Sequence, residues 1–124
     1  MQFRACYRAF LFEKAIKSFN RKRDFKLNQS LIYVLIICKQ LSDRCSLITA
    51  SVITEKLKSL NIPLRSRQVY QYVELLEKEG FLKSKKTIYR KLETKYYLVE
   101  PELTITLANF EKHFRKTRLY SKQF

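Results

Sequence analysis

The feature that most constrains this sequence is its near lack of glycine: the 124 residues contain one Gly and two Pro. Glycine-rich phosphate-binding loops and dinucleotide-binding fingerprints need several glycines at fixed spacing, so the sequence nearly excludes both. Turn-dense sandwiches are disfavoured for the same reason. A chain of this length, with 46% hydrophobic residues, has room for one buried core. We therefore expect a single, mainly helical domain over residues 1–124.

The second constraint is charge. Lys and Arg number 26 against 11 Asp and Glu, which gives a formal net charge of +15 at pH 7. Such a charge repels itself unless a polyanion offsets it, and nucleic acid is the commonest polyanionic partner. An anionic membrane surface is a less favoured candidate. The longest apolar run, residues 31–38, is too short to cross a bilayer, so we expect no membrane-spanning segment.

Residue types that carry chemistry are scarce. The three cysteines, Cys6, Cys38 and Cys45, are odd in number and form no CxxC pair, which favours a reduced, cytoplasmic and nucleoid-associated location. The N-terminus lacks the apolar segment of a signal peptide. The only histidine, His113, is far from every Cys, so no metal site is expected. Without a nucleophile motif or paired Asp residues, we expect no catalytic residues, no enzyme activity and no cofactor.

Apolar spacing predicts five helices separated by polar or breaking residues. The second of them, apolar on every face, should be the central core helix. Side-chain oxygens suited to N-capping precede three of them, at Asn28 or Ser30, at Thr49 and at Ser66. The helices are expected at residues 2–19, from Asn28 or Ser30 to about 41, at 50–59, at 66–79 and at about 102–117, with Pro101 suited to the first turn of the last.

The helix at residues 66–79 leads into a predicted hairpin. Its apolar face is Val69, Tyr72, Val73 and Leu76, at helical spacing. Gly80, the only glycine, follows where a left-handed C-terminal cap needs it. Two β-prone segments, 81–86 and 94–99, then flank a polar stretch at 87–93, which we expect to be the connection of the hairpin.

The stretch Leu75–Leu82, reading Leu-Leu-Glu-Lys-Glu-Gly-Phe-Leu, resembles the join between recognition helix and wing in winged helix-turn-helix regulators. The resemblance covers residues 28–100. The extra helices at both ends are similar to those of the dimeric multiple-antibiotic-resistance-type and PadR-type regulators. The resemblance to winged helix-turn-helix regulators implies a mainly α fold with a small β-hairpin and double-stranded DNA as the partner. The expected parts are an N-terminal helix and basic connection (1–27), a winged-helix core (28–100) and a C-terminal helix with a basic tail (101–124).

The physics of groove binding fits this order of elements. A helix fits the major groove, and a hairpin beside it reaches the backbone or the minor groove. Arg pairs with guanine, Gln with adenine, and helix N-termini favour phosphate. The candidate DNA-contacting residues are Thr49, Arg65, Ser66, Arg67, Gln68, Tyr70 and Gln71 on the helices and Lys83, Lys85, Lys86, Arg90 and Lys91 on the hairpin.

Other interpretations of the same residues stay open. Lysines on an edge strand also protect a solvated edge from aggregation. A replication or mobile-element initiator would use the same DNA-binding residues, and a winged-helix module that binds protein would share the fold. No feature of the sequence identifies a small-molecule effector.

The first helix is apolar around most of its circumference, which is more than one small domain can cover. We therefore expect a homodimer built from the two end helices. The expected interface residues are Phe3, Tyr7, Phe10, Leu107, Phe110 and Phe114.

Overall fold

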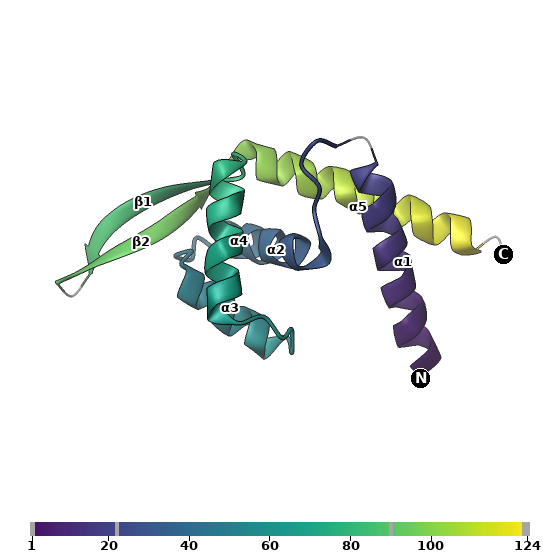
Figure 1. Cartoon of the computed structure of the whole chain (residues 1–124), viewed down its shortest axis with the longest axis horizontal. Coiled ribbons are helices and arrows are strands. Elements are labelled where there is room, and N and C mark those ends of the chain that lie inside the picture. Colours follow the sequence, from purple (N-terminus) through teal and green to yellow (C-terminus); the bar gives the residue numbers. More distant parts are fainter. Residues whose placement is uncertain (1, 22, 90, 123–124) are drawn as a thin grey trace.

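The computed structural model describes residues 2–21, 23–89 and 91–122, and the side chains of residues 11–21, 23–88 and 91–116. These residues form a mainly helical fold with one two-stranded antiparallel sheet, as the sequence predicts (Figure 1). The last helix is longer than expected, because it continues to Lys122. In chain order the elements are α1 (Gln2–Asn20), α2 (Gln29–Asp43), α3 (Ala50–Ser59), α4 (Ser66–Lys78), β1 (Leu82–Tyr89), β2 (Leu92–Val99) and α5 (Pro101–Lys122).

Helix α2 is the central core helix, which confirms the prediction from its apolar sequence. It begins after Asn28, whose Oδ1 accepts a hydrogen bond from the Leu31 N–H at 2.8 Å. It packs against α3, α4, α5 and β2, so it is covered on nearly every side. Its buried residues are Leu31, Ile32, Val34, Leu35, Ile37, Cys38 and Leu41.

Helices α2, α3 and α4 end in the same way, with a residue of positive φ just after the cap. The three residues are Cys45 (φ 55°), Asn61 (φ 59°) and Gly80 (φ 87°). After α4, the Gly80 N–H donates to the Glu77 carbonyl at 3.1 Å and the Phe81 N–H to the Leu76 carbonyl at 2.9 Å. This pair of bonds closes the last turn and sends the chain directly into β1. The sequence predicts such an end only at the glycine.

The hairpin is longer than the sequence predicts. Strands β1 and β2 pair without a break from Leu82 opposite Val99 to Tyr89 opposite Leu92. The prediction that residues 87–93 form the connection is therefore wrong, since residues 87–89 belong to β1 and pair with 92–94 of β2. Thr, Ile and Tyr favour extended backbone, and pairing provides hydrogen-bond partners for their N–H and C=O groups. Arg90 lies outside the described residues.

The root of the hairpin is fixed to the helical core. The Tyr97 N–H donates to the Ile48 carbonyl at 2.9 Å, which joins β2 to the segment before α3. Phe81, Leu82 and Tyr97 are buried there. The rest of the hairpin extends away from the helices (Figure 1).

Helices α1 and α5 cross through a cluster of aromatic rings. Phe12 meets Phe110 and Phe114 edge to face, at 5.6 and 5.9 Å between ring centroids, and Phe19 meets Phe110 at 5.6 Å. Leu103 and Phe110 of the α5 stripe are buried within the chain, whereas Leu107 and Phe114 stay half-buried. The N-terminal half of α1 continues beyond this crossing (Figure 1).

Burial raises the pKa of the Cys38 thiol from its usual 9.0 to about 12. Above pH 9 the unfolded chain loses a proton that the folded chain keeps, so stability falls as pH rises. We predict that the free energy of unfolding drops by up to about 1.4 kcal/mol per pH unit as pH rises above about 9. The pKa of Tyr97 is also raised by burial, so a variant without the thiol is needed to isolate the part that Cys38 contributes. Urea denaturation measures this slope.

The variant Cys38→Ala serves as the comparison. It creates a cavity in the core and lowers stability at every pH. Its pH slope should nevertheless be flatter, because the titrating thiol is gone. If the unfolding free energy of the two proteins falls equally steeply with pH, the Cys38 thiol is not the group responsible.

Candidate nucleic-acid interface

Helix α4 is amphipathic, with one face in the core and the other exposed along its length. Val69, Val73 and Leu76 are fully buried, which confirms three of the four predicted core positions. Tyr72, the fourth, is half-buried. The opposite face presents Arg67, Tyr70, Gln71 and Glu74 to solvent. Three residues of the predicted contact set, Arg67, Tyr70 and Gln71, therefore lie together on one surface.

The N-terminus of α4 is capped differently from the prediction. Ser66 is the first helical residue, so it does not serve as the N-cap, and Arg65 occupies that position. An Arg side chain has no acceptor atom, and Gln68 Oε1 instead accepts the Arg65 N–H at 3.0 Å. The oxygen of Gln68 is thus engaged in an intramolecular hydrogen bond, although Arg65, Ser66 and Gln68 are all exposed.

Thr49 caps α3 as predicted. Its Oγ1 accepts a hydrogen bond from the Val52 N–H at 3.1 Å, and the side chain is half-buried. This hydroxyl therefore has a structural role, which is to cap the N-terminus of α3.

The strand register divides the basic residues of the hairpin between two faces. Side chains alternate along a strand, so Lys83 and Lys85 share the face of Tyr96 and Leu98. Lys86 lies on the opposite face with Lys95 and pairs across the hairpin with Glu93 at 3.5 Å. Lys91 is exposed beside the turn. The predicted basic hairpin is thus one basic face, an opposite face on which Lys86 and Lys95 are paired with Glu93 and Glu77, and a basic tip.

A carboxylate on α4 holds the hairpin in place. Ser84 Oγ donates to Glu77 Oε1 at 2.9 Å, and Lys95 Nζ lies 3.8 Å from Glu77 Oε2. Lys95 also lies over the Tyr97 ring, 5.6 Å from its centroid. These contacts link both strands of the hairpin to the last turns of α4. This role of Glu77 cannot be predicted from the sequence, because a separation of seven residues across a turn leaves no periodic signal.

Tyr97 keeps its proton in this environment. Burial raises the pKa of its hydroxyl, and the nearby carboxylates Glu77 and Glu74 raise it further. The phenol is therefore neutral at physiological pH.

In the described part of α4 and the hairpin, cations outnumber carboxylates, so the exposed surface is positive.

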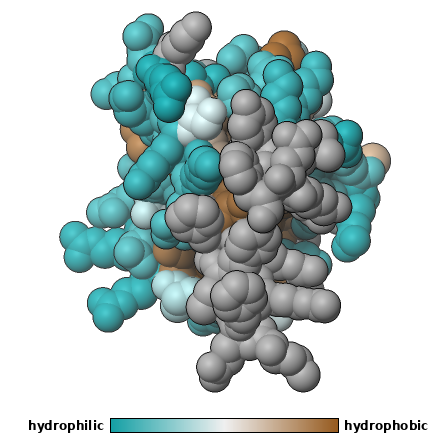
Figure 2. All heavy atoms as spheres, turned by 90° about the vertical axis from the view of Figure 1, so that its right-hand side faces the viewer, coloured by the Kyte–Doolittle hydropathy of each residue, from teal (hydrophilic) through white to brown (hydrophobic). Residues whose placement is uncertain are grey.

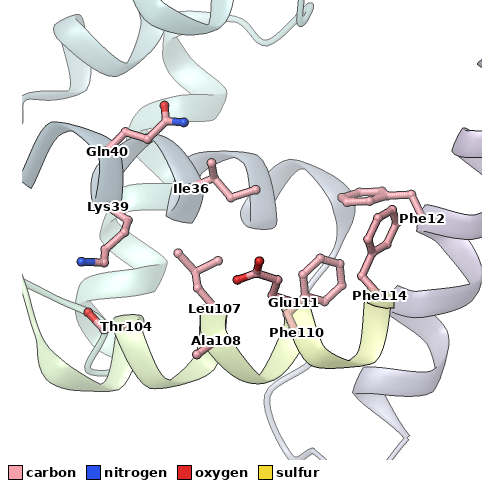
Figure 3. Close-up of a pocket in the computed structure, with 10 residues that line it drawn as sticks. All are labelled: Phe12, Ile36, Lys39, Gln40, Thr104, Leu107, Ala108, Phe110, Glu111 and Phe114. Carbon is pink, nitrogen blue, oxygen red and sulfur yellow. The ribbon is translucent and has the colours of Figure 1, made fainter. Parts of the chain in front are cut away.

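The structure describes three of the six side chains expected at a dimer interface. Leu107, Phe110 and Phe114 line a groove of about 470 Å³ between α2 and α5, with Phe12 of α1 at one end (Figure 3). Ile36 lies on the opposite wall. Phe3, Tyr7 and Phe10 have side chains outside the described set.

Two further observations bear on partners. In the described ranges, no three His, Cys, Asp or Glu side chains gather as a group that could hold a metal ion. Among the same residues, no helix is both long and apolar enough to cross a membrane. On the face that Figure 2 shows, hydrophilic side chains make up most of the coloured surface and hydrophobic ones appear in small patches.

The link between α4 and the hairpin gives a direct prediction. Ser84→Ala removes the hydrogen bond that Glu77 Oε1 accepts, and we expect it to cost about 1 kcal/mol of unfolding free energy. Amide exchange should also become faster in residues 84–97. Ser46→Ala, at an exposed serine in the loop before α3, is the matched control. If both variants lose the same stability, Glu77 does not hold the hairpin.

Comparison with models of protein families finds no match to this chain, and comparison with curated proteins finds none either. What this surface binds must therefore be inferred from its own shape, charge and exposed groups.

Proposed function

We propose that this protein binds double-stranded DNA in a sequence-specific manner as a winged helix-turn-helix. Helix α4 would enter the major groove, and the β1–β2 hairpin would contact the backbone or minor groove. The observation that carries the proposal is the exposed face of α4, where Arg67, Tyr70 and Gln71 lie together beside a basic hairpin. The order α2, α3, α4, hairpin and the contact of Tyr97 with Ile48 support the same fold type.

The groups on α4 match the edges of base pairs. Arg67 can donate two hydrogen bonds to guanine, and Gln71 can pair in the same way with adenine. Glu74, one turn further on, can accept from the amino group of cytosine. Gln68 is less suited to base contact, because its oxygen already accepts the Arg65 N–H. We therefore assign the reading of sequence to Arg67 and Gln71.

The hairpin supplies contacts that do not depend on sequence. Lys83 and Lys85 share one exposed face, and Lys91 lies at the tip. Lysines bind phosphate as point charges, so they position the protein without reading bases. Within this proposal the protein acts as a small transcriptional regulator. A replication or mobile-element initiator would use the same surface.

We also propose that the protein works as a homodimer. The N-terminal half of α1 continues past α5 and carries Phe3, Tyr7 and Phe10, and Leu107 and Phe114 are only half-buried in the groove beside it. Two-fold pairing of these end helices would cover the apolar segments and present two copies of α4 to one DNA duplex.

Arg67→Ala tests the role of α4. We expect a loss of roughly 1–3 kcal/mol on the preferred site and a relaxed preference at one base pair. Fluorescence anisotropy with the preferred duplex and a scrambled duplex measures both effects. Lys14→Ala, which removes one exposed charge from α1, should change neither. An equal loss on the two duplexes would reduce Arg67 to a phosphate contact.

The salt dependence of the same binding reaction tests whether DNA is the partner at all. If about six phosphates are neutralised, log K falls with log salt at a slope near −5. A slope shallower than about −2 would make DNA an incidental partner.

Tyr7→Glu tests the dimer. A charge in the N-terminal half of α1 should shift the protein from dimer to monomer in sedimentation at about 20 μM, an ample concentration for a micromolar dimer. The helical circular dichroism signal should remain. Lys17→Glu, an exposed position on the same helix, is the control. A wild-type protein that sediments as a monomer would contradict the arrangement.

A further inference from the structure

A cavity of about 270 Å³ is lined by residues from the end of α1 and from the middle of α5. These two segments lie away from α4 (Figure 1). The cavity is lined by Phe19 and Arg23 from the α1 end and by Asn109, Lys112, His113 and Lys116 from α5. Three of these six side chains are cations, and none is a carboxylate. Neither the DNA-reading surface nor the apolar groove uses this cavity.

The guanidinium of Arg23 is held in place before any ligand arrives. Its Cζ lies 4.8 Å from the centroid of the Phe19 ring, and its Nε donates to the Phe25 carbonyl at 3.4 Å. Phe19 is itself buried, so the ring is a rigid floor for the cation. No described residue accepts a hydrogen bond from the two terminal nitrogens of Arg23, which leaves its planar fork available to an oxyanion.

Helix α5 brings further donors to the same place. Lys112 and Lys116 are four residues apart and therefore lie on one face of the helix, where their like charges repel. Asn109, nearly one turn before Lys112, adds an amide. The acidic neighbour Glu111 lies on the other side of α5, where it lines the apolar groove and pairs with Arg115 at 2.7 Å. Asp24 follows Arg23 but forms no part of the lining. Among the described residues that line the cavity, no carboxylate neutralises the three cations.

We infer that this cavity is a binding site for a phosphate group. A planar guanidinium fixed on an aromatic ring, two ammonium groups and an amide form the donor set that a tetrahedral oxyanion takes. A bound phosphate would also remove the repulsion between Lys112 and Lys116. The phosphate can belong to a free phosphorylated molecule or to the backbone of a nucleic acid, and the volume admits a group of that size. In the first case the site is independent of the proposed DNA binding.

Pyrophosphate tests the free-ligand source on the full chain. Titration of the ¹⁵N-labelled protein should give saturable shifts at Asn109, Lys112 and Lys116. Arg23→Lys keeps the charge but loses the fork, and should weaken binding about tenfold. Because Arg23 also packs on Phe19, a second variant is needed: Lys116→Gln alters only an exposed side chain and should weaken binding roughly threefold. Lys58→Gln removes one charge from α3 and should have no effect.

A DNA duplex of scrambled sequence tests the backbone source. If pyrophosphate does not saturate but the duplex shifts the same three residues, and Lys116→Gln weakens duplex binding while Lys58→Gln does not, the site holds backbone phosphate. The inference is overturned if neither probe shifts these residues, or if Lys58→Gln weakens binding as much as Lys116→Gln. A different result would contradict the proposed DNA function alone: the wild-type protein would bind no duplex, while pyrophosphate would still saturate the cavity.

Discussion

Packing around α2 determines where α3, α4, α5 and the root of β2 lie. Each fully buried Leu or Ile in this helix contributes roughly 1.5–3 kcal/mol, and seven of its residues are buried. Helices α3 and α4 pack on it together, α5 crosses it, and the root of β2 reaches it. Because α4 buries Val69, Val73 and Leu76 in this shared core, its other face has to point outward. The exposed row of Arg67, Tyr70 and Gln71 is thus a consequence of core packing.

A net charge of +15 opposes compact folding through self-repulsion, and the four ion pairs among the described residues offset only a part of it. Two of these pairs involve the hairpin, where Glu77 and Glu93 meet Lys95 and Lys86. Most cations stay on the surface, and the structure gathers some of them on the hairpin and at the α1–α5 junction. Both places are positive surfaces that an anionic partner would stabilise.

What the sequence predicts well is local. Thr49 caps α3 at the expected position, Gly80 ends α4 with a positive φ, and the apolar spacing of α4 identifies its core face, because each of these depends on residues one or two turns apart. The misses depend on longer-range or competing contacts. Arg65 and not Ser66 is the N-cap of α4, and the Arg65 N–H is bonded by the Gln68 side chain. Residues 87–89 pair with 92–94, which are their partners across the turn. The contacts of Glu77 with Ser84 and Lys95 depend on the packing of the hairpin beside α4, so the spacing of residues in the sequence does not predict them. The division of the lysines between two faces follows from a register that composition does not encode.

The central claim is that α4 reads the sequence of a DNA duplex while the hairpin holds the backbone. Selection of bound molecules from a pool of randomised duplexes, by the full chain at about 0.15 M salt, tests it most directly. The account predicts a recurring motif, arranged as two inverted half-sites with centres about 10 base pairs apart if two copies bind together. A pool that shows no enriched motif after repeated rounds, although protein and DNA remain bound, would contradict sequence reading by α4.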